Sequence, residues 1–199
     1  MLIALEGQDC TGKTTLSTKI KDFLRDKGFM IDCKSFPERT TFVEEYLSKG
    51  VASGIDPQYF QFTCFLQKRN WSTLEKVQDK WWVLDRWGPS GTVYGFIDSD
   101  KSMDFSYFMN TYDPNYRLLE PPVIGFIFLV SPEKLNDRLL SRGDPASCYE
   151  SLDKQMMIYE TFKLYASKDD SYKVIDTTDL CVEEVFDEVK GVLVSTFSL

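Results

Sequence analysis

The sequence predicts an α/β domain in which helices cover both faces of a parallel β-sheet. Short apolar runs alternate along the chain with segments whose apolar residues recur at helical spacing. Five apolar runs are expected as strands: residues 2–5, 29–34, 81–84, 123–130 and 172–176. A glycine-rich loop follows the first run, and open parallel sheets bind ligands at the carboxyl ends of their strands. We therefore expect a three-layer, five-stranded fold with its functional site at that edge.

The helices are predicted from their caps and their apolar stripes. Asp56-Pro57 and Ser131-Pro132 each place a capping side chain before a proline, which is typical of a helix start. Gly28 is expected just beyond the end of the first helix. The expected helices are residues 13–27, 41–49, 57–80, 88–94, 105–107, 132–141, 151–167 and 182–189. No repeat or linker interrupts this pattern, so residues 1–199 are expected to form one domain.

The composition argues against several classes of protein. With 31 acidic and 23 basic residues the net charge is −8, which argues against a nucleic-acid or acidic-membrane partner. The chain has no histidine, which excludes His-based triads and His-ligated metals. Its five cysteines are widely spaced without a C-x-x-C pair, as in free thiols of a reducing compartment. The longest apolar run, residues 123–130, is too short to span a bilayer. Together with the free thiols, this predicts a soluble, cytoplasmic enzyme.

The loop after the first strand carries the motif Gly7-x-x-x-x-Gly12-Lys13-Thr14, the pattern of a P-loop. Its glycines let backbone N–H groups point at phosphate oxygens, and the helix behind adds the positive end of its dipole. The lysine neutralises the terminal phosphates and the threonine hydroxyl binds Mg²⁺. The alternative is a glycine-rich turn without a nucleotide, but the strand before the motif and the helix after it favour a P-loop. The sequence therefore predicts a nucleoside triphosphate site and a P-loop NTPase fold.

Arginines follow the predicted strands at the same edge of the sheet. Arg39 follows the second strand, Arg86 follows the third, and Arg138 and Arg142 precede a late loop. One arginine on a surface loop is usually only solvated. Several at one edge, facing a P-loop, indicate a phosphate site, because planar guanidinium groups match phosphate oxygens.

Five segments of the chain resemble the thymidylate kinase family of nucleoside monophosphate kinases. They are Leu5-Glu6-Gly7 leading into the P-loop, Phe36-Pro37-Glu38-Arg39, Phe65-x-x-x-Arg69, Asp85-Arg86-Trp87-Gly88-Pro89-Ser90-Gly91, and Arg142-Gly143 followed by Tyr149-Glu150. The segments occur in the order and spacing of the family over roughly residues 1–165. The resemblance implies Mg²⁺-dependent phosphoryl transfer from ATP to dTMP, giving dTDP, by a homodimer with a short lid at about residues 142–150.

The resemblance also implies roles for individual residues. Lys13, Asp85, Arg86 and Arg142 would be catalytic, and Thr14 and Asp85 would hold Mg²⁺. The implied ATP-binding residues are Gly7, Gln8, Asp9, Cys10, Thr11, Gly12, Lys13, Thr14, Thr15, Arg138 and Arg142. The implied dTMP-binding residues are Asp9, Phe36, Arg39, Phe65, Arg69, Arg86, Ser90, Tyr94 and Tyr149.

Within the dTMP site the resemblance distinguishes phosphate, base and sugar contacts. Arg39 and Arg86 would hold the phosphate, while Asp9 would meet the 3′-hydroxyl. Phe65 would stack on the base, Arg69 would hydrogen-bond its edge with Ser90 nearby, and Tyr149 would crowd the 2′ position. The alternatives are that Phe65 and Tyr149 are core aromatic residues and that Ser90 is a helix cap.

Two positions depart from the pattern of the family. Trp87 stands where a tyrosine is usual, which keeps an aromatic ring. Cys10 stands where many members carry a P-loop arginine, and the lid holds few charges beyond Arg142 and Lys154. The sequence therefore leaves open which group meets the transferring phosphoryl.

Three other functions remain as alternatives. A deoxynucleoside kinase on the same fold would need a carboxylate base near the sugar, for which Glu38 is the candidate, but adjacent Arg39 favours an acceptor that carries phosphate. A broader-specificity deoxynucleoside monophosphate kinase would share the same site. A non-catalytic nucleotide switch is supported only by the absent P-loop arginine.

Overall fold

The computed structural model describes residues 1–76, 79–99, 102–142 and 147–199. Parallel strands form one sheet in the order β2-β3-β1-β4-β5. They are β1 (Leu2–Gly7), β2 (Ile31–Ser35), β3 (Trp81–Asp85), β4 (Ile124–Leu129) and β5 (Tyr172–Asp176). The register brings the carboxyl ends together, because Asp85 lies opposite both Leu5 and Ser35, and Gly7 lies opposite Phe128. The predicted five-stranded parallel sheet is confirmed.

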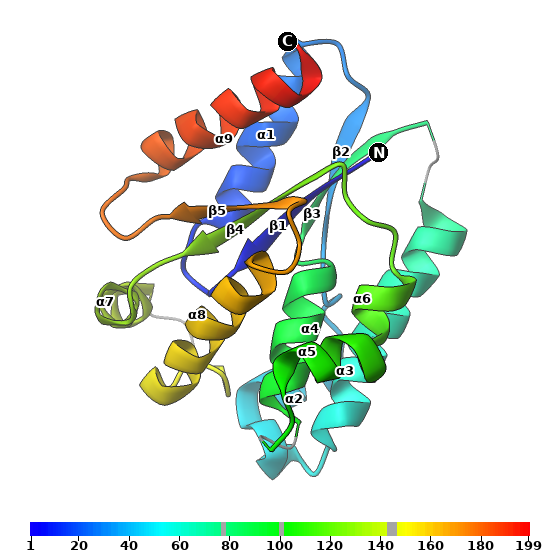
Figure 1. Cartoon of the computed structure of the whole chain (residues 1–199), viewed down its shortest axis with the longest axis vertical. Helices are drawn as coiled ribbons and strands as arrows, with labels where there is room; N and C mark the ends of the chain where they lie inside the picture. Colours follow the sequence, from blue (N-terminus) through cyan, green and yellow to red (C-terminus); the bar gives the residue numbers. More distant parts are fainter. Residues whose placement is uncertain (77–78, 100–101, 143–146) are drawn as a thin grey trace.

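Helices cover both faces of this sheet, as Figure 1 shows. On one face α1 (Lys13–Asp26) and α9 (Val182–Phe197) bury Leu16 and Val189 against the strands. On the other face α4 (Gly88–Ile97) and α8 (Leu152–Ala166) bury Val93 and Phe162. Both layers are needed because the strands are apolar on both sides, and every residue of β1 is buried.

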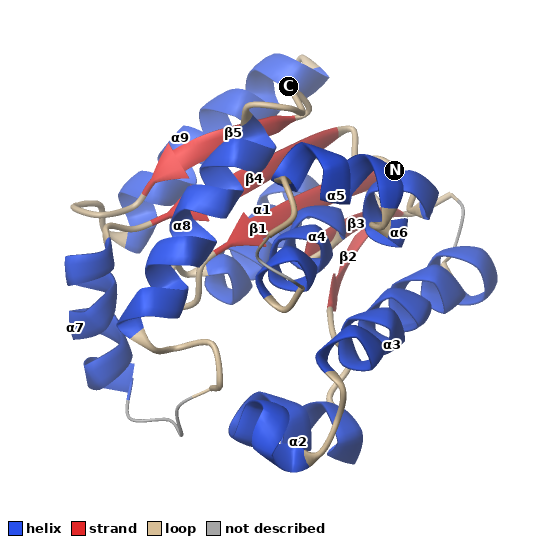
Figure 2. Ribbon diagram, turned by 60° about the horizontal axis from the view of Figure 1, so that its bottom comes forward, coloured by secondary structure: helices blue, strands red, loops and turns tan. Residues whose placement is uncertain are grey.

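The remaining helices lie around these layers, only some of them beside the carboxyl ends of the strands. They are α2 (Thr41–Lys49), α3 (Pro57–Asn70), α5 (Phe105–Thr111), α6 (Pro114–Leu118) and α7 (Pro132–Arg142). Figure 2 shows α2 and α3 on one side of this edge and α7 and α8 on the other. The expected cap of α3 is present, because the Tyr59 N–H donates to Asp56 Oδ1 at 2.9 Å. Among the described residues, no helix is both long and apolar enough to cross a membrane.

Several predicted helix bounds were wrong. The helix expected over 57–80 ends at Asn70 and continues only as a π-helical turn, Trp71–Glu75. Its buried Trp71 contacts three aromatic rings, so tertiary packing overrides the helical periodicity there. The helix α6 was not predicted, although Asp113-Pro114 starts it, with Asp113 Oδ1 accepting from the Asn115 N–H at 2.9 Å. Helices predicted to end at residues 94, 107 and 189 run on to Ile97, Thr111 and Phe197.

Candidate active site

The P-loop is held against the end of β4. Gly7 has φ 120°, and a Cβ atom there would lie 2.0 Å from the carbonyl oxygen of Phe128, so only glycine fits. The Gln8 N–H donates to that carbonyl at 3.3 Å, and the Val130 N–H donates to Gln8 Oε1 at 2.9 Å. Gly12, at φ 84°, is the N-cap of α1. The loop therefore lies fixed at the amino end of α1, where the helix dipole favours an anion.

Lys13 lies beside the loop and is almost fully buried. Its Nζ donates to the carbonyl oxygen of Gln8 and, at 3.3 Å, to Thr11 Oγ1. Burial, together with the charge of Arg86, lowers the pKa of Lys13 from its usual 10.5 to about 8. A phosphate group at the loop would supply the negative charge that restores a fully protonated ammonium group.

Thr14 and Asp85 place two oxygen atoms beside the P-loop. Thr14 Oγ1 donates to Asp85 Oδ2 at 2.7 Å, which joins the first turn of α1 to the end of β3. Hydroxyl and carboxylate oxygens are hard donors of the kind that Mg²⁺ prefers. The residues present therefore fit the metal that the sequence predicts.

Arg86 links the P-loop to α4. Its guanidinium group forms an ion pair with the carboxylate of Asp9 and donates, at 3.2 Å each, to the Gly7 carbonyl oxygen and to Ser90 Oγ. The hydroxyl of Tyr94 lies 3.4 Å from Arg86 Nη1. Burial alone would raise the pKa of Asp9, but the charges of Arg86, Lys13 and Arg142 together outweigh burial and lower that pKa. Asp9 is therefore a carboxylate at neutral pH.

Glu6, at the end of β1, fixes the backbone on which Arg86 stands. It is fully buried and accepts hydrogen bonds from the Trp87 N–H at 2.6 Å and the Ser90 N–H at 2.9 Å. Ser90 is thus tied to a helix start, and it also lines the cavity. Arg86 has φ 68°, a left-handed conformation that residues other than glycine adopt rarely. Such backbone persists where surrounding contacts over-determine it, and it is concentrated at functional sites.

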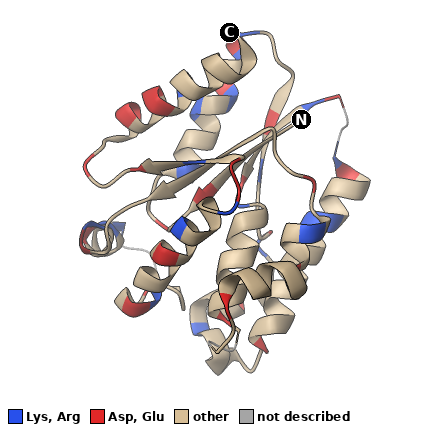
Figure 3. Ribbon diagram, viewed as in Figure 1, with Lys and Arg blue, Asp and Glu red and all other residues tan. Residues whose placement is uncertain are grey.

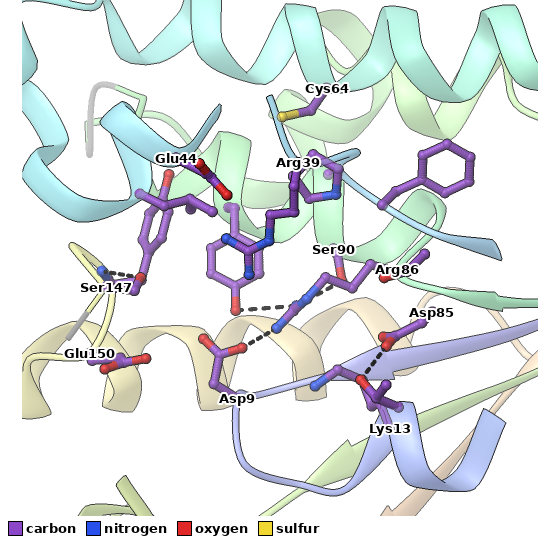
Figure 4. Close-up of a pocket in the computed structure, with 18 of the residues that line it drawn as sticks. Asp9, Lys13, Arg39, Glu44, Cys64, Asp85, Arg86, Ser90, Ser147 and Glu150 are labelled. Atoms are coloured by element: carbon purple, nitrogen blue, oxygen red, sulfur yellow. Dashed lines mark hydrogen bonds and ion pairs between the residues drawn. The ribbon is translucent and has the colours of Figure 1, made fainter. Parts of the chain in front are cut away.

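The side chains from these elements line one cavity of about 750 Å³. Figure 4 shows Arg39 reaching from the opposite side towards the Asp9–Arg86 pair. The predicted site residues that line the cavity are Asp9, Cys10, Gly12, Lys13, Thr14, Thr15, Phe36, Arg39, Asp85, Arg86, Ser90, Tyr94, Arg142 and Tyr149. Acidic residues recur on the outer helices, including α9 (Figure 3), so these cations stand within an acidic shell.

The two late arginines have different surroundings. Arg138 does not line the cavity but holds the P-loop to the segment after β5, because it donates to the Cys10 carbonyl oxygen at 3.4 Å and to Thr177 Oγ1 at 3.1 Å. Arg142 does line it, with Nη2 2.6 Å from Glu150 Oε1. Residues 143–146 of the predicted lid lie outside the described residues.

Phe65 and Arg69 are not brought to the cavity. Phe65 is buried with its ring 6.0 Å from that of Phe62, and the exposed Arg69 donates to the Leu118 carbonyl oxygen at 3.1 Å. The residues of α3 that line the cavity are Phe60, Gln61, Cys64 and Lys68. Phe65 and Arg69 each follow a lining residue, Cys64 and Lys68, by one position. One position turns a side chain by about 100° around a helix, so Phe65 and Arg69 do not share the face of those lining residues.

The face of α3 that meets the cavity was therefore not predicted from the sequence. The spacing of Phe60, Cys64 and Lys68 is helical and could have indicated a common face. Lys68 is buried, and its Nζ donates to the Trp87 carbonyl oxygen. Burial lowers the pKa of Lys68, and the nearby Glu6 carboxylate opposes this change.

A parallel sheet of this strand order, with a P-loop at its edge and arginines facing the loop, defines a P-loop nucleotide kinase. The family model described as thymidylate kinase matches residues 5–189. The chain belongs to the thymidylate kinase family, whose members are nucleoside monophosphate kinases and phosphotransferases.

Individual relatives agree with this assignment. The probable thymidylate kinase of Archaeoglobus fulgidus is 26% identical, over 100% of this chain and 97% of its own length. That of Plasmodium falciparum is 26% identical over 84% of this chain and 78% of its own length. The solved thymidylate kinase of Candida albicans superposes with a TM-score of 0.78 at 19% identity, covering 99% of this chain and 92% of its own, which supports the fold.

Proposed function

We propose that the protein transfers the γ-phosphoryl group of ATP to the phosphate of dTMP, with Mg²⁺, and releases ADP and dTDP. The observation that carries the proposal is that a P-loop and two arginines, Arg39 and Arg86, line one cavity. A kinase that acts on a nucleoside monophosphate needs cations for the acceptor phosphate as well as for the triphosphate. Here the two arginines can serve the acceptor phosphate and Lys13 of the P-loop can serve the triphosphate.

The acceptor end supports a monophosphate rather than a nucleoside. A nucleoside 5′-hydroxyl needs a general base, and Glu38 was the candidate. Glu38 forms an ion pair with Lys34 and does not line the cavity, whereas its neighbour Arg39 does. A phosphate oxygen is already ionised at neutral pH and needs no base, so the cations at this end suit dTMP.

The reaction then depends on position and charge. The P-loop N–H groups and Lys13 bind the triphosphate. Arg86, whose side chain is paired with Asp9 and whose backbone is fixed through Glu6, contacts the acceptor phosphate. Thr14 and Asp85 would hold Mg²⁺, which would supply positive charge to neutralise the phosphates. Alignment of the two phosphates supplies the remaining acceleration without any proton transfer by the protein.

The acceptor base would lie against α3. Phe60 supplies an aromatic ring there, Lys68 supplies hydrogen-bond donors, and Gln61, whose amide N–H groups bind Asp98 and Tyr149, leaves its carbonyl oxygen as an acceptor. We assign the base-binding role to these residues rather than to Phe65 and Arg69, because the latter two do not line the cavity.

We further propose a homodimer that acts in the cytoplasm. The exposed apolar side chains Tyr59, Phe62 and Leu66 recur on one stretch of α3, and such a patch favours a protein partner. The five cysteines are free thiols, which suits a reducing compartment. Light scattering of the parent and of Phe62→Glu tests the dimer: a dimer that becomes a monomer in the variant is expected, and a monomeric parent would contradict it.

Steady-state ADP formation tests the acceptor. The parent protein is given ATP with dTMP, dCMP, dGMP, UMP or thymidine in parallel. We expect dTMP to have the highest kcat/KM. A higher kcat/KM for thymidine would identify a nucleoside kinase instead, and no turnover with any acceptor would indicate a nucleotide-binding switch.

A further inference from the structure

Side chains from separate segments meet at the carboxylate of Asp98, the residue that follows α4. Its Oδ2 accepts hydrogen bonds from the Tyr149 hydroxyl, from Gln61 Nε2 at 2.9 Å and from the Tyr46 hydroxyl at 3.4 Å. Gln61 Nε2 also donates to the Tyr149 oxygen at 3.0 Å. Donors from α2, from α3 and from the segment before α8 therefore meet at one oxygen atom.

The same contacts fix the segment that carries Tyr149. The Cys148 N–H donates to the Leu47 carbonyl oxygen at 2.7 Å, which ties this segment to α2. Lys154 Nζ donates to the Cys148 carbonyl oxygen at 2.8 Å and lies 5.2 Å from the centre of the Tyr149 ring. Asp98 adds a further contact to this segment, because it ties the end of the Tyr149 side chain to α3 and α4.

Tyr149 stands between Asp98 and the cavity. Tyr149 lines the cavity, and its ring meets that of Tyr94, also a lining residue, edge to face at 4.8 Å. Asp98 itself is not a lining residue. Burial raises the pKa of Tyr149, so its hydroxyl keeps the proton that it donates to Asp98. With its hydroxyl held and its ring packed, Tyr149 forms a stationary part of the cavity wall.

We propose that Asp98 is a positioning residue that makes the acceptor site selective for 2′-deoxyribose by holding Tyr149 in place. This inference rests on the proposed function and on the contact of Tyr149 with the 2′ position of the acceptor sugar, which the resemblance to the family implies. A 2′-hydroxyl adds one oxygen atom, which a fixed aromatic ring excludes and a released ring accommodates by a small rotation. Apolar pockets reject an added hydroxyl by roughly 100-fold, which sets the largest effect that the release of the ring could remove.

The test compares two acceptors that differ only at the 2′ position, dTMP and ribothymidine 5′-monophosphate. The selectivity is the ratio of their kcat/KM values. It is measured for the parent, Asp98→Ala, Asp98→Asn, Tyr149→Phe and the double variant Asp98→Ala with Tyr149→Phe. The matched control is Asp169→Ala, because Asp169 also accepts a tyrosine hydroxyl, that of Tyr165 at 3.4 Å, but does not line the cavity.

We expect Asp98→Ala to lower the selectivity by at least about fivefold, mainly through a lower KM for the ribonucleotide. Tyr149→Phe should lower it by a similar factor and the double variant no further, because both changes remove one interaction. Asp98→Asn, which keeps one acceptor oxygen, should retain part of the selectivity, and Asp169→Ala should retain all of it.

A merely structural role for Asp98 predicts other results. Asp98→Ala would then lower the activity on both nucleotides alike and leave their ratio unchanged, which would overturn the proposal. A double variant whose loss equals the product of the two single losses would also overturn it. If Asp98→Ala fails to fold, Tyr149→Phe decides, since it keeps the carboxylate with its two other donors. A parent protein that phosphorylates neither nucleotide would refute the proposed function itself, a result distinct from an unchanged ratio.

Discussion

Arg142 Nη1 lies 3.6 Å from Cys10 Sγ, so an arginine from the end of α7 reaches the P-loop residue where many relatives were expected to carry their own arginine. The same guanidinium group donates to Glu150, which lies shortly before the start of α8. Arg142 therefore brings positive charge to the triphosphate side of the cavity.

Arg142→Ala should lower kcat by at least about tenfold, because the charge on the transferring phosphoryl would be left unmatched. Cys10→Arg, added to that variant, should restore part of the rate by supplying a guanidinium from the loop. Steady-state kinetics with ATP and dTMP provides the measurement, and Arg25→Ala, a change at an exposed and ion-paired arginine, is the control.

A change confined to the KM for ATP would contradict this role. Arg142 would then contact the adenine, and the charge at the phosphoryl group would have to come from Arg86 or Lys154.

Lys13→Met should lower kcat by about 100-fold or more, a loss of ~2.7 kcal/mol of transition-state stabilisation. The variant keeps most of the volume of the buried side chain, so its thermal midpoint should stay close to that of the parent. A folded variant that retains more than about a tenth of the parent kcat, under ~1.4 kcal/mol lost, would refute the P-loop assignment.

The affinity for ATP should also depend on pH through Lys13, whose pKa in the free protein is lowered to about 8. Bound phosphates favour the protonated amine and raise that pKa. Below pH 8 the lysine is already charged and contributes no pH dependence; above pH 8 a proton must be taken up on binding, so affinity falls by up to about tenfold per pH unit. Calorimetric titration between pH 7 and 9 provides the measurement, and an equal slope in Lys13→Met would contradict the assignment.

Asp85→Asn should raise the Mg²⁺ concentration needed for half-maximal rate by at least about threefold. The amide keeps the shape of the side chain but loses the charge that suits a divalent cation. Initial rates over a Mg²⁺ series at saturating ATP and dTMP provide the measurement. An unchanged Mg²⁺ dependence would remove Asp85 from the metal site.

Arg39→Ala should raise the KM for dTMP by at least about tenfold while leaving the KM for ATP within about twofold. The reason is that Arg39 lines the acceptor end of the cavity and faces the Asp9–Arg86 pair. The matched control is Arg69→Ala, because Arg69 is bound to the Leu118 carbonyl on the surface and should leave both constants unchanged. A larger effect at Arg69 than at Arg39 would restore the base-binding role that the sequence alone assigned to it.

Most of the fold followed from sequence features that act locally. The apolar runs gave the strands, and the P-loop was recognisable because its glycines, lysine and threonine occur within eight residues at a strand–helix junction. The edge of the sheet was predictable for the same reason, since parallel strands bring all their carboxyl ends together.

The parts that could not be predicted depend on contacts between distant segments. The spacing of Phe65 and Arg69 fits a helix but does not say which side of α3 faces the sheet. The side of α3 that faces the sheet is fixed by the packing of Trp71 against Phe36, Trp82 and Trp87. The same packing ends the helix. The role of Asp98 could not be predicted from a sequence motif, because the three residues that donate to its carboxylate come from the distant positions 46, 61 and 149.

Transfer of label from [γ-³²P]ATP tests most directly that the acceptor is the phosphate of dTMP. The parent protein is incubated with labelled ATP, Mg²⁺ and either dTMP or thymidine, and the products are separated by chromatography. We expect labelled dTDP from dTMP and no labelled dTMP from thymidine. Labelled dTMP from thymidine, or label that stays in ATP or appears only as inorganic phosphate, would contradict it.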